Sequence, residues 1–355
     1  MNYKSPLEEM SRTTPTHFWN DNCSIKDLSF ALEHGAVGAT TNPVIVGQVL
    51  EAELETYLPL IRELVANNPT DTEDDIAWKL NEHMAAAGAR LLEPVFKETG
   101  GKAGYISIQV NAKYYRNAEK IVAQALHFKS LAPNIMVKMP VTSAGVEAIE
   151  ETTYQGVNVN ATVSFTVPQA IAVAEAVARG MKRREAENKD NSSLNPVCTI
   201  MVGRTDDWLK EYADATDAVL NPLAHDMAGV AVFKRAYSIY KERGYHTRLL
   251  AAAFRSQLHW TELVGGDVSM TIPPNWIRKF VKSDIKIENH MDTPVDPKLL
   301  SQLQKHLPDF NRAYEPDGMK PEEFVGYGST VRTMTQFLGG YDKMVGLVRK
   351  YMLNI

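Results

Sequence analysis

Short apolar runs alternate with longer amphipathic segments along most of this chain, and this alternation restricts its fold more than any other feature. Eight runs have the length and composition of strands, and we expect strands at residues 17–19, 36–41, 105–110, 134–139, 157–163, 197–202, 248–252 and 268–272. Strands that alternate with helices are typical of a parallel sheet. Eight such units in about 270 residues predict a closed (β/α)8 barrel of the α/β class rather than an open sheet.

The segments between these strands predict the helices that surround the barrel. Apolar residues at helical spacing indicate helices at 25–33, 44–67, 70–96, 114–128, 144–154, 167–184, 208–213 and 227–243. We expect Gly35 to end the first of them, and residues 70–73 (TDTE) have the pattern of a capping box that opens the third. Residues 185–193 (EAENKDNSS) predict a polar surface loop.

The length of 355 residues is compatible with two domains or with one large barrel. We expect a single domain over residues 1–355. Helical spacing near residues 298–306 and 331–351 predicts that about residues 275–355 form a helical extension packed on the barrel.

The composition argues against several classes of protein. Hydrophobic residues make up 44% and charged residues 23%, which indicates an ordered globular chain, and a net charge of −5 argues against a nucleic-acid partner. Two cysteines cannot build a disulfide framework, so we expect a reducing, cytoplasmic location. The polar N-terminal segment does not resemble a signal peptide, and no apolar run is long enough to span a membrane.

Functional side chains of a (β/α)8 barrel lie at the carboxyl ends of its strands. The polar residues at or near the expected strand ends include an acid, a lysine, two arginines, amides and hydroxyls: Asp21, Thr41, Asn42, Gln109, Lys138, Asn160, Thr162, Thr199, Arg204, Arg255 and Thr271. The nine histidines form no HExxH motif or close pair, and no phosphate-binding glycine loop is present. We therefore expect neither a metal nor a cofactor.

Lys138 lies in the apolar run of residues 135–140 (IMVKMP), in the strand predicted at residues 134–139. Burial lowers a lysine pKa because it disfavours the ammonium form, and a neutral amine is a nucleophile for carbonyl carbons. The alternative is a lysine whose side chain extends to solvent at the strand end. We favour the nucleophile, since buried unpaired lysines are rare outside functional sites.

The acid and the arginines each allow two interpretations. Asp21 could cap the helix that begins after Ser24, or could transfer protons beside a reactive lysine. Arg204 and Arg255 could bind a phosphate together or could form surface ion pairs. The candidate reactive lysine favours the proton-transfer role for Asp21, and the two interpretations of each arginine stay open at this point.

Five segments resemble, in the same order, the signature segments of the transaldolase family, which are class I (Schiff-base) aldolases on an eight-stranded barrel. They are residues 39–43 (ATTNP), 137–140 (VKMP), 158–162 (NVNAT) with Gln169-Ala170, 202–204 (VGR) and 252–255 (AAFR). The resemblance covers about residues 21–274.

The resemblance implies a role for each strand-end residue. Lys138 would form the Schiff base, Asp21 would be the general acid and base, and Gln109 and Thr162 would act on the catalytic water. The substrate would be held by Thr41, Asn42, Asn160, Thr199, Arg204 and Arg255, with the two arginines on its phosphate.

The reaction implied by the resemblance moves a dihydroxyacetone unit from sedoheptulose 7-phosphate to glyceraldehyde 3-phosphate, giving erythrose 4-phosphate and fructose 6-phosphate in the pentose phosphate pathway. No cofactor is needed, and the partners are small sugar phosphates. Neither a nucleic acid nor a membrane is expected, and the oligomeric state stays open, with a homodimer as one option.

The sequence departs from the family pattern at a few positions. Gln109 stands where transaldolases usually have a glutamate and fructose-6-phosphate aldolases have a glutamine. Met201 lacks the tyrosine hydroxyl of those aldolases, and Ala253 and Thr199 replace two serines. The alternatives are therefore a lyase of the fructose-6-phosphate aldolase kind, a related enzyme acting on another ketose, or a non-catalytic sugar-binding barrel, against which the intact Lys138 and Asp21 argue.

Overall fold

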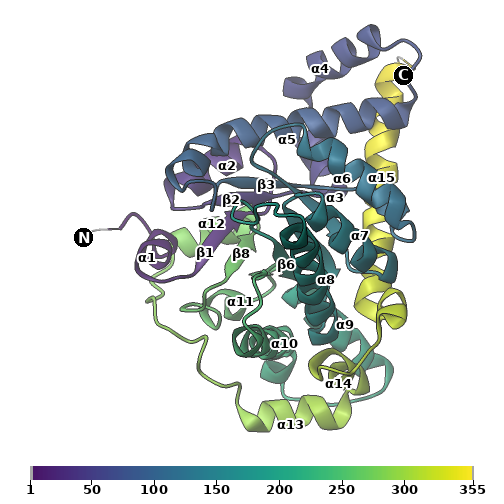
Figure 1. Ribbon diagram of the computed structural model, residues 1–355. Helices are drawn as coiled ribbons and strands as arrows, with labels where there is room; N and C mark the ends of the chain where they lie inside the picture. Colours follow the sequence, from purple (N-terminus) through teal and green to yellow (C-terminus); the bar gives the residue numbers. More distant parts are fainter. Residues whose placement is uncertain (1–2, 354–355) are drawn as a thin grey trace.

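The computed structural model describes residues 3–353, and its centre is a closed barrel of eight parallel strands in sequential order (Figure 1). The strands are β1 (His17–Asn20), β2 (Gly38–Thr40), β3 (Tyr105–Gln109), β4 (Ile135–Pro140), β5 (Val159–Ser164), β6 (Val197–Ile200), β7 (Arg248–Ala251) and β8 (Ser269–Ile272). The barrel closes where β1 pairs with β8. The predicted (β/α)8 barrel is confirmed.

Helices follow the strands and cover the outside of the barrel. They are α2 (Ile25–Glu33), α6 (Ala118–Lys129), α7 (Ser143–Tyr154), α8 (Val167–Ala186), α9 (Val202–Ala215), α10 (Pro222–Arg243), α11 (Leu258–Thr261) and α12 (Pro274–Val281), with a short 3-10 turn η1 (Ala112–Tyr114) before α6. Ser24 caps α2, and Gly35 adopts a positive φ of 94° just beyond its end, as expected for a glycine that stops a helix.

Some predicted boundaries were wrong. Residues 44–67 form two helices, α3 (Pro43–Ala52) and α4 (Leu54–Asn67), because the backbone leaves the helical conformation at Glu53. The capping box of α5 (Glu73–Glu98) is made by Thr72 and Asp75, two residues later than the predicted box at 70–73. Helix α9 begins at Val202, where a strand was expected.

The N-terminal helix α1 (Pro6–Thr13) was not predicted. Ser5 caps it, Leu7 and Met10 are buried, and the helix contacts β1 and α12. Among residues 3–353, no helix is both long enough and apolar enough to cross a membrane.

The C-terminal helices are α13 (Pro297–His306), α14 (Pro308–Tyr314) and α15 (Gly328–Met352), with a 3-10 segment η2 (Pro321–Gly326) before α15. Helix α13 contacts α10, and α15 contacts α3, α5, α9 and β5. In Figure 1, α15 runs along one side of the molecule, with α4 close to its C-terminal end. The division of the chain into one barrel domain and a helical extension stays a prediction.

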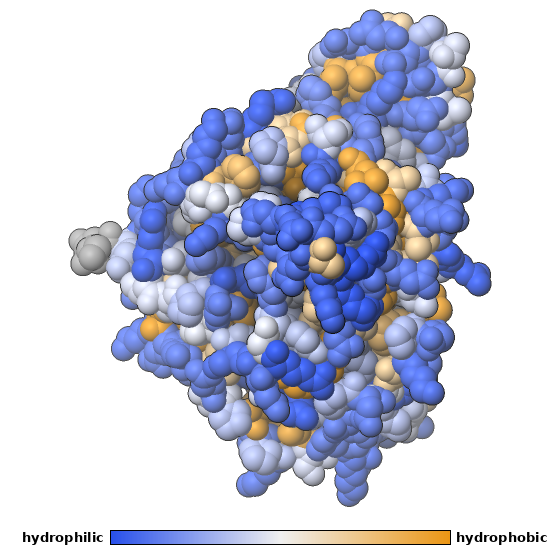
Figure 2. All heavy atoms as spheres, in the orientation of Figure 1, coloured by the Kyte–Doolittle hydropathy of each residue, from blue (hydrophilic) through white to orange (hydrophobic). Residues whose placement is uncertain are grey.

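A second hydrophobic cluster lies outside the barrel and holds the end of α15. It joins α3, α4 and α5 to α15 through buried side chains that include Val46, Leu50, Ile61, Leu80, Tyr341, Met344 and Val348. Trp78 donates a hydrogen bond from Nε1 to the Tyr341 hydroxyl over 3.2 Å. Hydrophilic side chains dominate the face of the molecule shown in Figure 2.

Candidate active site

The strand register brings three of the predicted site residues side by side. Gln109 on β3 pairs with Lys138 on β4, and Lys138 pairs with Asn160 on β5. In a parallel sheet, residues in register point to the same face. The three side chains therefore form one row at the C-terminal part of the barrel, and all three are buried.

Lys138 is the unusual member of this row. Its side chain is 2% exposed, and within residues 3–353 its amine takes part in no hydrogen bond or ion pair. Burial lowers the pKa of this lysine, Arg204 lowers it further, and the nearby Asp21 opposes both. The expected burial of Lys138 is confirmed. Because burial lowers the lysine pKa, it increases the fraction of neutral amine available as a nucleophile.

Asp21 follows β1 and lies close enough to Lys138 for their charges to interact. Its Oδ1 accepts a hydrogen bond from Thr40 Oγ1 over 2.6 Å, and Thr40 in turn bonds the Thr271 hydroxyl. Burial raises the Asp21 pKa, while Lys138, Thr40, Arg204 and Arg255 oppose the shift. The helix-cap interpretation of Asp21 was wrong, because Ser24 caps α2.

Two predicted substrate ligands already have partners within the protein. Asn160 donates to Ser107 Oγ over 2.9 Å and accepts from Thr199 Oγ1 over 2.7 Å, and all three side chains are fully buried. Asn42 Oδ1 caps α3 by accepting the N–H groups of Val44 and Ile45. The cap fixes Asn42 at the barrel end and leaves its amide nitrogen for other partners.

Several buried polar atoms at this end of the barrel have no hydrogen-bond partner among the described residues. They are Thr41 Oγ1, Gln109 Oε1, Thr162 Oγ1, Ser164 Oγ, Arg204 Nε and Thr330 Oγ1. An unsatisfied buried polar group costs about 1–3 kcal/mol, and native structures keep few of them. Gln109, which carries one of these atoms, is in register with Lys138, so a hydroxylated ligand or an ordered water bound beside the lysine would satisfy it.

The backbone between two of these groups is strained. Val163 has a φ of 55°, and the register of β5 against β6 shifts between Ala161 and Ser164. A β-branched residue with a positive φ is an outlier that persists where surrounding structure imposes it, and such residues cluster at functional sites. The bulge directs the flanking side chains, Thr162 and Ser164, away from simple strand alternation.

The two arginines reach the site from different elements. Arg204 lies in the first turn of α9, and its Nη1 donates to Thr333 Oγ1 and Gln336 Oε1 of α15. Burial and the neighbouring Arg255 guanidinium lower its pKa to about 10, so it stays charged at neutral pH. Arg255 follows β7 and pairs through Nε and Nη2 with Asp207. The ion-pair interpretation therefore describes Arg255 in this state.

A close backbone contact joins the two arginine segments. Ala253 has a left-handed φ of 64°, and its carbonyl oxygen would lie 1.9 Å from a Cβ placed on Gly203. Only glycine fits at position 203 without displacing the loop after β7. This contact brings Arg204 and Arg255 to the same side of the barrel end.

Sequence reasoning missed Thr40, Ser107 and the α15 residues Thr333 and Gln336. The first two lie inside strands and could be identified only once the register was known. The α15 residues are 129 and 132 positions from Arg204 in the sequence, and no local pattern connects them.

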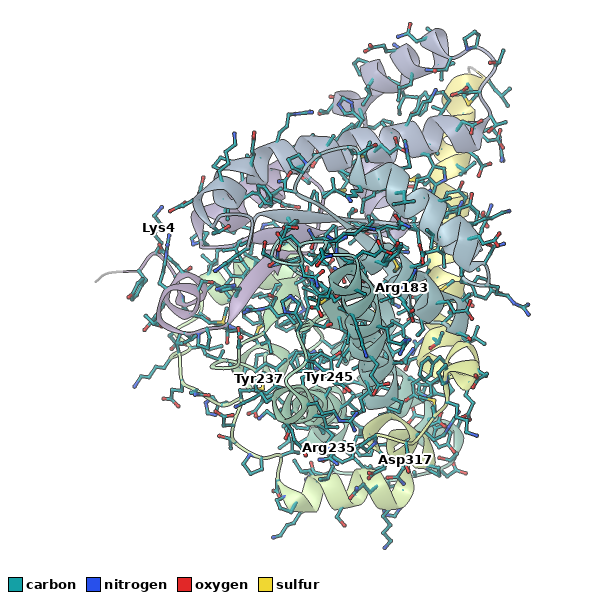
Figure 3. All side chains as sticks on the ribbon, in the orientation of Figure 1. Lys4, Arg183, Arg235, Tyr237, Tyr245 and Asp317 are labelled. Atoms are coloured by element: carbon teal, nitrogen blue, oxygen red, sulfur yellow. The ribbon has the colours of Figure 1, made fainter. Side chains whose placement is uncertain are left out.

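A cavity of about 760 Å3 opens at the opposite end of the barrel, where the strands begin. Its lining includes His17, Tyr105 and Arg248, together with Tyr237 of α10 and Tyr245 in the loop after α10, both labelled in Figure 3. None of the predicted site residues lines it. The chemistry of the side chains, rather than cavity size, therefore identifies the candidate site.

The structure is a (β/α)8 barrel with a buried lysine, a nearby carboxyl group and two arginines at the carboxyl ends of its strands. This is the arrangement expected of the active site of a barrel enzyme. The chain belongs to the transaldolase/fructose-6-phosphate aldolase family, whose model matches residues 18–316. The predicted family resemblance is confirmed.

Curated relatives carry the same family name. The chain is 30% identical over 209 residues to a transaldolase of Kocuria rhizophila, a match that covers 58% of this chain and 56% of the relative. It is 31% identical over 208 residues to transaldolase 2 of Streptomyces coelicolor and 30% identical over 208 residues to a transaldolase of Mycobacterium tuberculosis. These two matches cover 58% of this chain and 55% of each relative, so the matched region spans just over half the length of the curated relatives.

Proposed function

We propose that this protein is a transaldolase, which transfers a dihydroxyacetone unit between ketose and aldose phosphates through a Schiff base on Lys138. The observation that carries the proposal is the buried Lys138 amine, which has no partner in the described chain and lies near Asp21. The family and the curated relatives support the same chemistry.

In the proposed donor reaction, neutral Lys138 attacks C2 of a ketose, and loss of the resulting hydroxyl as water gives an iminium. Asp21 removes the proton of the C4 hydroxyl, the C3–C4 bond breaks, and the aldose leaves. The electron pair of that bond moves into the iminium, which becomes an enamine. The raised pKa of Asp21 suits a group that must both accept and return a proton.

In the proposed acceptor reaction, the enamine carbon adds to the carbonyl carbon of a second aldose, and Asp21 returns its proton to the new hydroxyl. Water then hydrolyses the iminium, which releases the new ketose and restores Lys138. Gln109 and Thr162 contribute the buried, unpartnered oxygens that can orient this water. No cofactor takes part.

Substrate recognition is assigned to the hydroxyl, amide and guanidinium groups around the row of Gln109, Lys138 and Asn160. Thr41, Asn42, Asn160 and Thr199 would contact or support the sugar hydroxyls, and Arg204 and Arg255 would bind the phosphate. Arg255 must then exchange its contact with Asp207, at least in part, for the phosphate. We place the protein in the cytoplasm and the pentose phosphate pathway, with small sugar phosphates as its partners.

The second candidate is a lyase of the fructose-6-phosphate aldolase kind, and Gln109 favours it. A glutamine amide can hydrogen-bond to water but cannot accept its proton, unlike the glutamate usual in transaldolases. Met201 argues against the lyase, because its buried side chain supplies no hydroxyl at the start of α9.

The test is to incubate the protein with fructose 6-phosphate, with and without erythrose 4-phosphate, and to measure sedoheptulose 7-phosphate and free dihydroxyacetone. The proposal predicts sedoheptulose 7-phosphate only when the acceptor is present, and little dihydroxyacetone without it. Rapid dihydroxyacetone release without acceptor would assign the protein to the lyases. The absence of both products would contradict both candidates. Lys138→Met serves as the inactive control.

A further inference from the structure

Behind the arginine cluster lies a buried histidine–carboxylate pair that the proposed reaction does not use. His259 of α11 is 0% exposed and Asp206 of α9 is 1% exposed, and His259 Nε2 lies 2.6 Å from Asp206 Oδ2. Buried ionisable groups are costly unless each polar atom is paired, so a pair enclosed in this way needs a reason.

The hydrogen bonds around the pair determine which ring nitrogen carries the proton. The backbone N–H of Arg255 donates to His259 Nδ1 over 3.0 Å, so Nδ1 must accept and cannot hold a proton. The ring proton is then on Nε2 and is donated to Asp206 Oδ2. Asp206 Oδ1 accepts the backbone N–H of Gly229 over 2.7 Å.

These contacts form one chain from the α10 backbone to the backbone of a predicted phosphate ligand. Asp206 is fixed by Gly229 and fixes the tautomer of His259, and His259 holds the N–H of Arg255. Arg255 lies two residues beyond Ala253, which has a left-handed φ of 64°. A strained turn of this kind persists only where surrounding contacts impose it.

We infer that Asp206 and His259 are positioning residues that hold the Arg255 backbone in the geometry required to bind the phosphate of the substrate. The inference rests on the proposed function, since it takes Arg255 as a phosphate ligand. Neither residue forms a hydrogen bond with Lys138 or Asp21 in the described chain, so we assign their effect on the site to Arg255.

Three substitutions separate the links of this chain. Asp206→Asn keeps the shape of the side chain and the oxygen that accepts from Gly229. Its amide N–H, however, would face the proton on His259 Nε2, so the variant favours the other tautomer of the ring. In that tautomer the proton on Nδ1 points at the Arg255 N–H, and the hydrogen bond between them is lost. His259→Gln reaches Asp206 but lacks an acceptor at the Nδ1 position. His259→Asn places an amide oxygen at the Nδ1 position and loses the contact with Asp206.

The readouts are the KM for fructose 6-phosphate, the inhibition constant of inorganic phosphate, and borohydride trapping of Lys138 by dihydroxyacetone, which carries no phosphate. We expect D206N and H259Q to raise the KM and weaken phosphate inhibition about ten- to a hundredfold, as misplacement of a positioning group does. Trapping by dihydroxyacetone and kcat should change little. H259N should restore most of the phosphate affinity.

Nitrogen-15 NMR of labelled histidine gives an independent signature of the tautomer. The wild type should show a histidine with unprotonated Nδ1 and protonated Nε2, identified as His259 by its loss in H259N, and D206N should reverse the two. Thermal melts show which variants fold. If D206N does not fold, the comparison of H259Q with H259N still decides the test.

Unchanged KM in D206N and H259Q, equal losses with fructose 6-phosphate and dihydroxyacetone, or an H259N variant as impaired as H259Q would each overturn the inference. Failure of the proposed function gives a different result, because dihydroxyacetone would then leave Lys138 unmodified in the wild type.

Discussion

Thr40→Val tests whether the protonation of Asp21 is controlled by a neighbouring hydroxyl. Thr40 donates to Asp21 Oδ1 over 2.6 Å and lowers the Asp21 pKa against the effect of burial. Valine keeps the shape of the side chain and removes the donor. A hydrogen bond to a charged group stabilises it by about 1.5–3 kcal/mol, which equals roughly a ten- to hundredfold change in the carboxylate population at a fixed acidic pH.

The assay is the pH dependence of kcat/KM for transfer from fructose 6-phosphate to erythrose 4-phosphate. Removal of the donor raises the Asp21 pKa further, so the acidic limb should move to higher pH. Well above this limb, the variant and the wild type should approach the same rate. Below it, the variant should lose roughly ten- to a hundredfold in rate, in line with the energy above.

Two controls isolate the hydrogen bond. Thr40→Ser keeps the hydroxyl and should keep the wild-type profile, and Thr271→Val removes the other partner of Thr40 while leaving its contact with Asp21. A T40V profile with the wild-type acidic limb and a lower plateau would refute the reasoning, since Thr40 would then act on packing rather than on the protonation of Asp21.

Four other substitutions give separate tests. Lys138→Met should abolish turnover and raise the melting temperature near pH 7, because a buried lysine with a lowered pKa binds its proton more weakly in the folded than in the unfolded chain. The gain in melting temperature should shrink as the pH rises toward the ordinary lysine pKa, and an equal gain at all pH values would contradict this cause. Arg204→Ala and Arg255→Ala should each weaken fructose 6-phosphate binding by about 1.5–3 kcal/mol, measured as KM, with dihydroxyacetone trapping as the phosphate-free comparison; equal losses for both would make the arginines structural. Gln109→Glu should shift the pH–rate profile, because it adds a titratable group beside the water of the proposed mechanism. An unchanged profile would place Gln109 outside the path of the proton.

The barrel and the position of the candidate nucleophile could be predicted from the sequence for the same physical reason. Parallel strands are buried on both faces, so the apolar run around Lys138 was visible as a strand and its charged residue as an exception. The carboxyl-end rule then placed Asp21, Gln109 and Asn160 near it, and the register put Gln109 and Asn160 in the same row as Lys138.

The missing parts depend on contacts between distant segments, which local periodicity does not encode. Asp206 and His259 are 53 residues apart and meet only when α9 and α11 pack together. Thr333 and Gln336 reach Arg204 only because α15 packs against α9. The break at Glu53 could not be predicted either, because the apolar spacing of residues 44–67 continues through it.

The most direct measurement of the central claim is mass spectrometry of peptides after borohydride reduction in the presence of fructose 6-phosphate. Reduction converts the iminium into a stable secondary amine, so the modified lysine can be identified in a digest. The account predicts a ketose-derived or dihydroxyacetone-derived adduct on Lys138 that is lost in Lys138→Met. The absence of any adduct, or an adduct on another lysine that persists in this variant, would contradict it.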